Sequence, residues 1–466
     1  MKTLPVVKAT PEQLPLISQN RLGVEVICGA AGSGKTSTAL LRLRSLCYMA
    51  LGRYQRQNIE RPVRILILTF NRTLSGYVRT LVHSQISADL NVRLDIDTFS
   101  SWANLNLPDM KIIGYENYFL KSLAKNINAL TAEYVINEVT YLLGRFLPEE
   151  LESYITVERT GRGSLPRVDK FLRRKILDEV VYPYLDYLAQ RNEKDWNGVA
   201  ISMMRDIPSL EYDVVIVDES QDFSANQLRA IKYHLAVDHT ITFVIDTVQR
   251  IYARGFTWAE VGFDVRSERI HKLKNNYRNT IEIASFAAGI LNDMPIDSDG
   301  ALPNLSSALQ HGDIPCILRG LYSKQLEWAI DYIKNKIDLT KESVAFLKPL
   351  GGQWFDFTKQ KLIESNLNFV ELTRERDWPV SDVNIALSTF HSAKGLEFDY
   401  VFILGFNNEN TPFSGEDVDD KIYVLRRLLA VAVARARTHI VIGYKPGIES
   451  KLTAYFDPHT YTILDI

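Results

Sequence analysis

The feature that most constrains the fold is a glycine-rich stretch at residues 29–36, which reads GAAGSGKT. It matches the pattern G-x-x-x-x-G-K-[ST] in full, follows an apolar run at residues 24–28 and opens a helical pattern at residues 36–51. Glycines let the main chain curl so that its N–H groups surround a phosphate, and the first turn of a helix adds a partial positive charge. The pattern therefore predicts a strand, a phosphate-binding loop and a helix, in preference to a glycine-rich turn without a ligand. The residues expected to form this cradle are Gly29, Ala30, Gly32, Ser33, Gly34, Lys35 and Thr36.

A second signal lies at residues 214–222, where four apolar residues run into a cluster of acids. Asp218, at the end of the apolar run, is suited to hold Mg²⁺ together with the hydroxyl of Thr36. Glu219 follows it and can polarise an attacking water, while Lys35 neutralises the β- and γ-phosphate oxygens. A surface turn after a strand also commonly carries Asp, but the apolar run and the phosphate loop together favour a nucleotide-hydrolysis site.

Further apolar runs alternate with helical patterns along the chain, and each run is closed by a polar cluster. Near-continuous apolar runs are typical of parallel strands that are buried on both faces. Their alternation with helices indicates an α/β fold with sites at the carboxyl ends of the strands. The eight predicted strands cover residues 24–28, 64–69, 214–218, 242–246, 344–347, 384–389, 400–404 and 439–443.

The runs form two groups, which predicts two parallel-sheet domains in a chain of 466 residues that is too long for one ordinary core. The first domain is expected to comprise residues 1–104 and 200–278, and the second residues 279–466. Residues 105–199 read mostly as helices and are expected to form an insertion in the first domain. Around residues 295–325 the second domain has room for at most a small insertion.

Composition excludes several classes of protein. The formal net charge of -2 argues against a basic coat over the whole surface, although a nucleic-acid groove needs only local positive charge. The cysteines are scattered and odd in number, which argues against a disulfide framework and a zinc site. No apolar stretch is long enough for a signal peptide or a membrane span, so a cytoplasmic protein with no membrane partner is expected.

Together with the phosphate loop, five later segments resemble, in the same order, the motif set of superfamily 1 helicases of the UvrD/Rep (SF1A) type. They read VDESQD, VIDTVQRIY, LKNNYRNT, STFHSAKGLEF and RRLLAVAVARAR, at residues 217–222, 244–252, 273–280, 388–398 and 426–437. The resemblance implies two RecA-like domains in a compact form, without the large 2B accessory domain or a fused nuclease. The sequence departs from the family pattern at Ile245, where Gly is usual, and at Ala430 and Ala434, where Tyr and Thr are usual.

The resemblance also implies which residues complete the ATP site: Gln13 and Tyr277 at the adenine, Glu397 at the ribose with Gly395 beside it, and Gln249, Arg278 and Arg435 at the γ-phosphate. Arg435 would act as an arginine finger from the second domain, which stabilises transition-state charge only when the domains close. Hydrolysis would then open and close the cleft and displace a strand that is bound across both domains.

The residues that the resemblance places at the nucleic acid are Thr69, Phe70, Asn71, Thr98, Phe99, Phe256, Trp258, Thr389 and His391. Hydroxyl and amide groups bind phosphates, and aromatic rings stack on bases without regard to sequence. Phe70 and Phe99 could equally be core residues, and the register of Phe256 and Trp258 is open. The basic stretch at residues 158–167 is either a phosphate-contacting loop or a solvated linker.

The phosphate loop and the acidic cluster predict an enzyme that uses ATP and Mg²⁺, and the resemblance implies that it acts on single-stranded DNA or a tailed duplex. One hypothesis is an ATP-dependent 3′→5′ DNA translocase and helicase in DNA repair, replication restart or phage defence. The other is a nucleic-acid-stimulated ATPase that serves as a regulatory subunit, for example of a separate nuclease, with little unwinding of its own. The intact catalytic residues favour the first hypothesis, and the substitutions at Ala430 and Ala434 favour the second.

Overall fold

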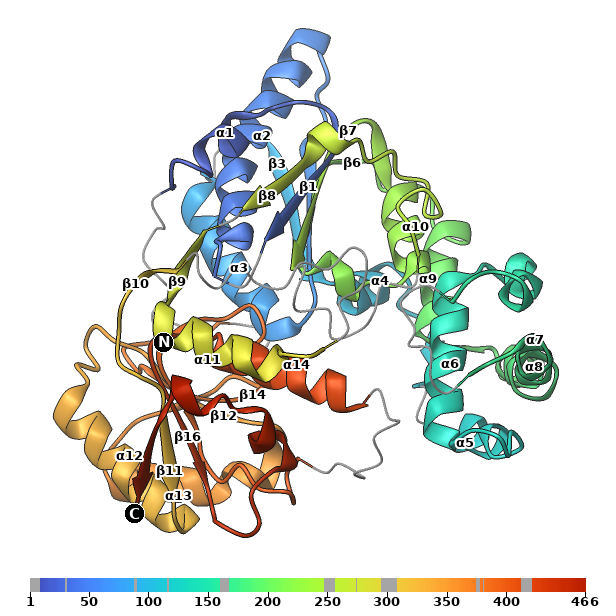
Figure 1. Cartoon of the computed structure of the whole chain (residues 1–466). Helices are drawn as coiled ribbons and strands as arrows, with labels where there is room; N and C mark the ends of the chain where they lie inside the picture. The colour runs from blue at the N-terminus through green and yellow to red at the C-terminus, as the bar shows by residue number, and fades with distance from the viewer. Residues whose placement is uncertain are drawn as a thin grey trace.

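The computed structural model describes residues 9–466 except 30–31, 88–89, 115–116, 160–166, 247–255, 274, 295–307, 374–377, 380 and 412–420. At positions 84, 85, 277, 309 and 421 only the main chain is described. Two fully parallel sheets, of six and seven strands, dominate the described part of the chain. Figure 1 shows one sheet above the other, with a helical unit beside the first sheet. The predicted α/β class with two parallel sheets is confirmed.

The first sheet has the strand order β3-β2-β6-β7-β1-β8. Its strands are β1 (Gly23–Gly29), β2 (Val63–Thr69), β3 (Val92–Thr98), β6 (Tyr212–Val217), β7 (Leu235–Asp246) and β8 (Ile270–Leu273). The helices around it are α1 (Leu14–Ser18), α2 (Lys35–Gln57), α3 (Arg72–Gln85), α4 (Phe99–Asn106), α9 (Trp196–Arg205) and α10 (Ala225–Tyr233).

Both faces of this sheet are buried, as its apolar runs predict. Strand β6 is buried at every position, and successive side chains of a strand point to opposite faces. Val214 and Ile216 accordingly belong to the core that includes residues of α2 and α3, whereas Val215 and Val217 belong to the core that includes residues of α4, α9 and α10. Helices therefore cover both faces and hold the carboxyl ends of the strands at one edge.

The two edge strands, β3 and β8, were not among the predicted runs. Strand β3 reads VRLDIDT, with charged residues at alternate positions, and most of its residues are only partly buried. An edge strand carries charges toward solvent, which discourages pairing with other chains. Such a strand lacks the continuous apolar run by which the central strands were recognised.

The second sheet has the order β13-β14-β12-β15-β16-β11-β17. Its strands are β11 (Cys316–Arg319), β12 (Val344–Lys348), β13 (Val370–Glu371), β14 (Ile385–Thr389), β15 (Phe398–Ile403), β16 (Ala436–Tyr444) and β17 (Thr462–Asp465). Its helices are α11 (Ile281–Leu291), α12 (Tyr322–Lys336), α13 (Asp356–Glu364) and α14 (Lys421–Val433). Alternate residues of β12 again serve two cores, Ala345 and Leu347 on the side of α11 and α14, and Val344 and Phe346 on the side of α12 and α13.

The chain between α4 and α9 forms the helical unit, which has a core of its own. It contains α5 (Tyr118–Ala124), α6 (Ala132–Arg145), a 3₁₀ helix (Pro148–Ile155), α7 (Lys170–Ile176), a π turn (Leu177–Val181) and α8 (Tyr182–Arg191). The short strands β4 (Lys111–Ile112) and β5 (Glu193–Lys194) pair where the chain enters and leaves the unit. Among the described residues, no helix is both long enough and apolar enough to cross a membrane.

Candidate functional site

The phosphate loop joins β1 to α2 and takes a backbone shape that favours glycine at two positions. Gly32 has φ 83° and Gly34 has φ 76°, in the left-handed region. A Cβ at Gly32 would lie 2.1 Å from Asn276 Oδ1 and 2.9 Å from Arg278 Cβ. A Cβ at Gly34 would lie 2.5 Å from Gln13 Nε2. Both glycines are therefore needed because Gln13, Asn276 and Arg278 pack directly against the loop.

The acids at the ends of β6 and β7 meet the side chains of the first two residues of α2. Lys35 Nζ lies 3.0 Å from Asp246 Oδ2, and the Thr36 hydroxyl lies 3.1 and 3.0 Å from the two carboxylate oxygens of Asp218. Burial, together with the neighbouring charge of Glu219, raises the pKa of Asp218 to about 7. A hydroxyl and a carboxylate are the hard oxygen donors that Mg²⁺ prefers, so these two residues fit the predicted metal site.

Glu219 is held in a strained position beside this pair. Its φ of 52° is unusual for a residue with a side chain, and such strain persists where the surroundings fix it. The Oε2 atom of its carboxylate accepts a hydrogen bond from Gln221 Nε2 and lies 3.4 Å from Lys394 Nζ. Gln221 in turn accepts a 3.1 Å hydrogen bond from the main-chain N–H of Asp246. The carboxylate is thus oriented by groups from both sheets.

Arg278 reaches the loop from β9 (Asn276–Thr280), a short strand that pairs with β10 (Ala308–Gln310). The Asn276 side-chain oxygen accepts hydrogen bonds from the main-chain N–H groups of Arg278 and Asn279, at 3.0 and 3.1 Å. The guanidinium of Arg278 is ion-paired with Glu397. Two residues assigned to the γ-phosphate and the ribose therefore contact each other beside the loop.

Arg435 lies between α14 and β16 and is 2% exposed. Its Nε donates to Val431 O at 3.0 Å and its Nη1 donates to Leu396 O at 3.3 Å. Burial, with a further contribution from Arg278, lowers the pKa of Arg435 to about 10, while the charges of Glu219 and Asp246 act in the opposite direction. Arg435 therefore lies within the electric field of the acids at the end of the first sheet.

Asn279 joins the two arginine segments. Its Nδ2 donates to the carbonyl oxygens of Ala434 and Ala436, at 3.1 and 2.5 Å, which flank Arg435. Arg278 and Arg435 are thereby fixed relative to one another through the main chain. Arg278 lies against the phosphate loop, and Arg435 is held beside the Arg278 segment by Asn279.

On the predicted nucleic-acid side, residues 69–71 lie against residues 389–394. Asn71 accepts the 2.8 Å hydrogen bond that caps α3, and its Nδ2 donates to the carbonyl oxygens of His391 and Lys394, each at 3.3 Å. Phe70 is half-buried, and its ring centre lies 4.9 Å from Lys394 Nζ. Thr389 caps the following turn by accepting from Ser392 N at 3.1 Å. Two segments from different sheets therefore contact each other, and Thr69, which is fully buried, presents no group to a bound strand.

Sequence comparison assigns the family. The UvrD/REP helicase N-terminal domain matches residues 10–263, which is more than half of the chain, and the UvrD-like helicase C-terminal domain matches residues 353–446. The chain belongs to the UvrD/REP helicase family.

Individual relatives in this family are distant. A "Probable DNA helicase" of Mycoplasma pneumoniae is 25% identical over 470 residues, covering 94% of this chain and 83% of that protein. A "Probable DNA helicase II homolog" of Rickettsia conorii is 26% identical over 308 residues, covering 61% of this chain and 44% of that protein. An "ATP-dependent DNA helicase Rep" of Buchnera aphidicola subsp. Baizongia pistaciae is 30% identical over 120 residues, covering 26% of this chain and 16% of that protein. This chain thus matches most of the first relative's length and less than half of the other two.

Of the remaining predicted ATP-site residues of this UvrD/REP family chain, Gln13 lies against the phosphate loop and Gly395 lies against α3. Gln13 is buried against the loop and donates to Ser33 O at 3.3 Å. Gly395, with φ 84°, faces α3, where an added Cβ would lie 2.6 Å from Leu74 Cδ2. The main chain of Tyr277 belongs to β9, but its side chain is outside the described part, as are residues Ala30 and Gln249.

Two predicted stacking residues are corrected. Phe99 is 4% exposed and packs edge-on against Trp102 and Phe223, and Phe256 is 5% exposed in the same core. A ring so enclosed presents no face to a base, so the core alternative holds for Phe99, and Phe256, whose register was open, is a core residue as well. Trp258 is partly buried and packs against Phe243, with ring centres 4.5 Å apart. Thr98 caps α4 by accepting from Ser101 N at 3.3 Å.

Five residues of the site were not predicted: Asp222, Asp246, Asn276, Asn279 and Lys394. All five lie inside the helicase-like segments at residues 217–222, 244–252, 273–280 and 388–398. Four of them are buried polar or charged residues that lie in or after strands, and Asp222 closes the turn after β6. A search for polar residues at predicted strand ends would have found Asp246, but the pairing of these residues depends on the tertiary fold.

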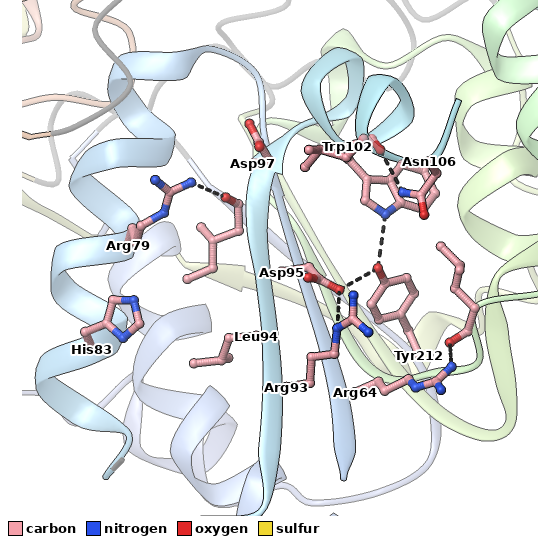
Figure 2. Close-up of a pocket in the computed structure, with 13 residues that line it drawn as sticks. Arg64, Arg79, His83, Arg93, Leu94, Asp95, Asp97, Trp102, Asn106 and Tyr212 are labelled. Atoms are coloured by element: carbon pink, nitrogen blue, oxygen red, sulfur yellow. Dashed lines mark hydrogen bonds and ion pairs between the residues drawn. The ribbon is translucent and has the colours of Figure 1, made fainter. Parts of the chain in front are cut away.

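A separate cavity of about 520 Å³ lies at the free edge of β3. Figure 2 shows Arg79 from α3 on one side of the strand and Trp102 from α4 on the other. Tyr212 donates to Asp95 Oδ2 at 2.7 Å, and Arg79 donates to Ile96 O at 2.7 Å. None of the predicted site residues lines this cavity, so it is distinct from the phosphate-loop site.

Proposed function

We propose that this chain hydrolyses ATP to move along single-stranded DNA in the 3′→5′ direction and to separate duplex strands. The observation that carries the proposal is that Arg278 lies against the phosphate loop, while Asn279, the next residue, donates hydrogen bonds to the main chain on both sides of Arg435. An arginine that completes the site from across an interface, the role proposed for Arg435, acts only when that interface is closed, which ties hydrolysis to domain movement. The "DNA helicase" names of the relatives support DNA as the substrate.

In this proposal each residue has one role in hydrolysis. The loop amides and Lys35 hold the β- and γ-phosphates, and Thr36 and Asp218 would hold Mg²⁺, which shields phosphate charge when bound. Glu219 accepts a proton from the water that attacks the γ-phosphorus as the bond to the bridging oxygen breaks. Arg278 and Arg435 stabilise the negative charge of the transition state.

We further propose that residues 1–104 with 200–278, and residues 279–466, are the two moving domains, and that residues 105–199 are the insertion. Segment 69–71 lies on the first domain and segment 389–394 on the second, so a strand held by both would be displaced as the interface opens. Phe70, Asn71, Thr389 and His391 are the proposed contacts. DNA repair, replication restart and phage defence are processes in which such a motor would serve, alone or with a separate nuclease.

A second function, a DNA-stimulated ATPase subunit with little unwinding of its own, is favoured by one observation. Ala430 and Ala434 are 5% and 8% exposed, at positions where the family pattern has Tyr and Thr. Apolar side chains there supply no hydroxyl to link α14 with its surroundings during closure. Strong hydrolysis with weak strand separation would then result.

The test measures ATP hydrolysis with and without single-stranded DNA, and then strand displacement on duplexes with a 3′ or a 5′ tail. Displacement of the 3′-tailed duplex alone supports the motor, and stimulation without displacement supports the ATPase subunit. Lys35→Ala should abolish hydrolysis, and EDTA should do the same if Mg²⁺ is required. Turnover that persists in Lys35→Ala would contradict the assigned site.

A further inference from the structure

Lys394 occupies an unusual position between the two sheets. Its side chain is fully buried, and its Nζ is ion-paired with Asp222 and lies 3.4 Å from Glu219 Oε2. The same ammonium lies 4.9 Å from the ring centre of Phe70. One side chain from the segment after β14 therefore contacts the proposed general base, a second buried acid and a proposed DNA-contacting ring.

The main chain around Lys394 packs closely against the N-terminal end of α3, a helix of the first sheet. Asn71, the cap of α3, donates to the carbonyl oxygens of both His391 and Lys394. The next residue, Gly395, is pressed so closely against Leu74 that a Cβ there would lie 2.6 Å from Leu74 Cδ2. Movement of residues 389–395 relative to α3 must therefore move the Lys394 ammonium.

The neighbouring carboxylates stabilise the protonated, charged form of Lys394. Burial disfavours the ammonium, but the carboxylates of Glu219 and Asp222 outweigh this effect and raise the pKa of Lys394 above its usual range. Burial raises the pKa of Asp222 to about 7, and the Lys394 charge opposes that rise. Charges buried at this depth are poorly screened, so a small displacement of the ammonium changes the field at Glu219 strongly.

We propose that Lys394 is a positioning residue through which a DNA strand bound at Phe70, Asn71, Thr389 and His391 controls the orientation of the Glu219 carboxylate. Lys394 and Gln221 both engage Oε2 of Glu219, which leaves Oε1 as the oxygen that accepts the proton from water. A DNA strand bound to Phe70 and Thr389 would contact both segments that the hydrogen bonds of Asn71 hold together around Lys394. This inference rests on the proposed function, because it concerns how DNA stimulates the same ATP site.

The first test compares Lys394→Met with Lys341→Met, an exposed lysine that pairs only with Asp338 among the described residues. For each purified full-length variant, kcat and KM for ATP are measured with and without a single-stranded oligonucleotide. We expect Lys394→Met to lower the ratio of stimulated to unstimulated kcat by about 10-fold, with KM for ATP held within about 2-fold. Lys341→Met should keep the wild-type ratio.

A merely structural role for Lys394 would reduce both rates by the same factor. An unchanged ratio in a folded Lys394→Met variant therefore overturns the proposal, whether or not kcat falls. Binding of a fluorescent oligonucleotide, followed by anisotropy, separates a loss of stimulation from a loss of DNA affinity. A lower ratio at saturating oligonucleotide supports the proposal.

Asn71→Asp is the second variant, and it tests whether Lys394 transmits DNA binding to Glu219 if Lys394→Met does not fold. Aspartate keeps the acceptor that caps α3 but loses the donor to the carbonyl oxygens of His391 and Lys394. The proposal predicts a reduced stimulation ratio here too, although Lys394 itself is intact. A wild-type ratio at saturating DNA would overturn it. Failure of the wild-type protein to be stimulated by DNA would instead refute the proposed function.

Discussion

Replacement of Arg435 by alanine separates catalysis from stability. The guanidinium makes two hydrogen bonds to main-chain carbonyls, at 3.0 and 3.3 Å, and hydrogen bonds from a charged group contribute about 1.5–3 kcal/mol each. Against this, burial that lowers the pKa of Arg435 from 12.5 to about 10 corresponds to roughly 3 kcal/mol of cost for the buried charge. The net loss in free energy of unfolding for Arg435→Ala should therefore be small, about 0–3 kcal/mol.

The effect on catalysis should be much larger. An arginine that stabilises charge on a transferring phosphoryl group contributes about 10³–10⁵ in kcat, or about 4–7 kcal/mol of barrier height. We expect DNA-stimulated kcat to fall at least about 10³-fold in Arg435→Ala, at temperatures well below its melting point.

Arg437→Ala is the matched control for this measurement. Arg437 is two residues away, is partly exposed and lies 3.5 Å from Asp399 Oδ1. A pair of this kind contributes at most about 1 kcal/mol, so kcat should stay within about 2-fold of the wild-type value. Thermal melts establish that both variants are folded. A folded Arg435→Ala variant that keeps kcat within about 10-fold of wild type would refute the role of Arg435 as the arginine finger.

Two further measurements test the described structure. The neutral ring of His234 accepts from Leu210 N at 3.1 Å and lies 2.9 Å from Met203 O, and burial lowers its pKa from 6.5 to about 4. The contribution of His234 to stability is complete above pH 6.5 and is lost as the pH falls toward 4. Between about pH 7.5 and about pH 5, the free energy of unfolding of the wild type, measured in urea titrations, should therefore fall by about 2 kcal/mol more than that of His234→Asn. Equal losses in the two proteins would contradict this assignment. Phe70→Ala should weaken oligonucleotide binding by about 1–3 kcal/mol in anisotropy titrations. Phe99→Leu should lower the free energy of unfolding by about 1 kcal/mol and leave the affinity for the oligonucleotide unchanged. Weaker oligonucleotide binding in Phe99→Leu, with unchanged binding in Phe70→Ala, would show that the two rings are wrongly assigned.

Strands and loops that depend on residues close together in the sequence could be predicted from the sequence. A parallel strand covered on both faces must be apolar at nearly every position, and all eight predicted runs form strands of the two sheets. The phosphate loop was equally clear, because its glycines, Lys35 and Thr36 act through the local backbone of one strand–helix connection. The edge strand β3 was missed because its alternating charges break the apolar run.

Contacts between distant residues could not be read in this way. The pair of Lys35 and Asp246 joins residues 211 positions apart, and that of Lys394 and Asp222 joins residues 172 positions apart. Each requires two sheets or two strands to be placed first, and no local pattern encodes that placement.

Phe70 and Phe99 illustrate the division between sequence and structure. Both follow a strand of the first sheet, but the sequence alone predicted only the strand before Phe70 and missed β3, which precedes Phe99. Only the tertiary structure decided their surroundings. Phe99 begins α4 and is enclosed by Trp102 and Phe223, whereas Phe70 meets Lys394 from the other sheet. Burial is set by what packs over a side chain, and that covering comes from chain segments far away in the sequence.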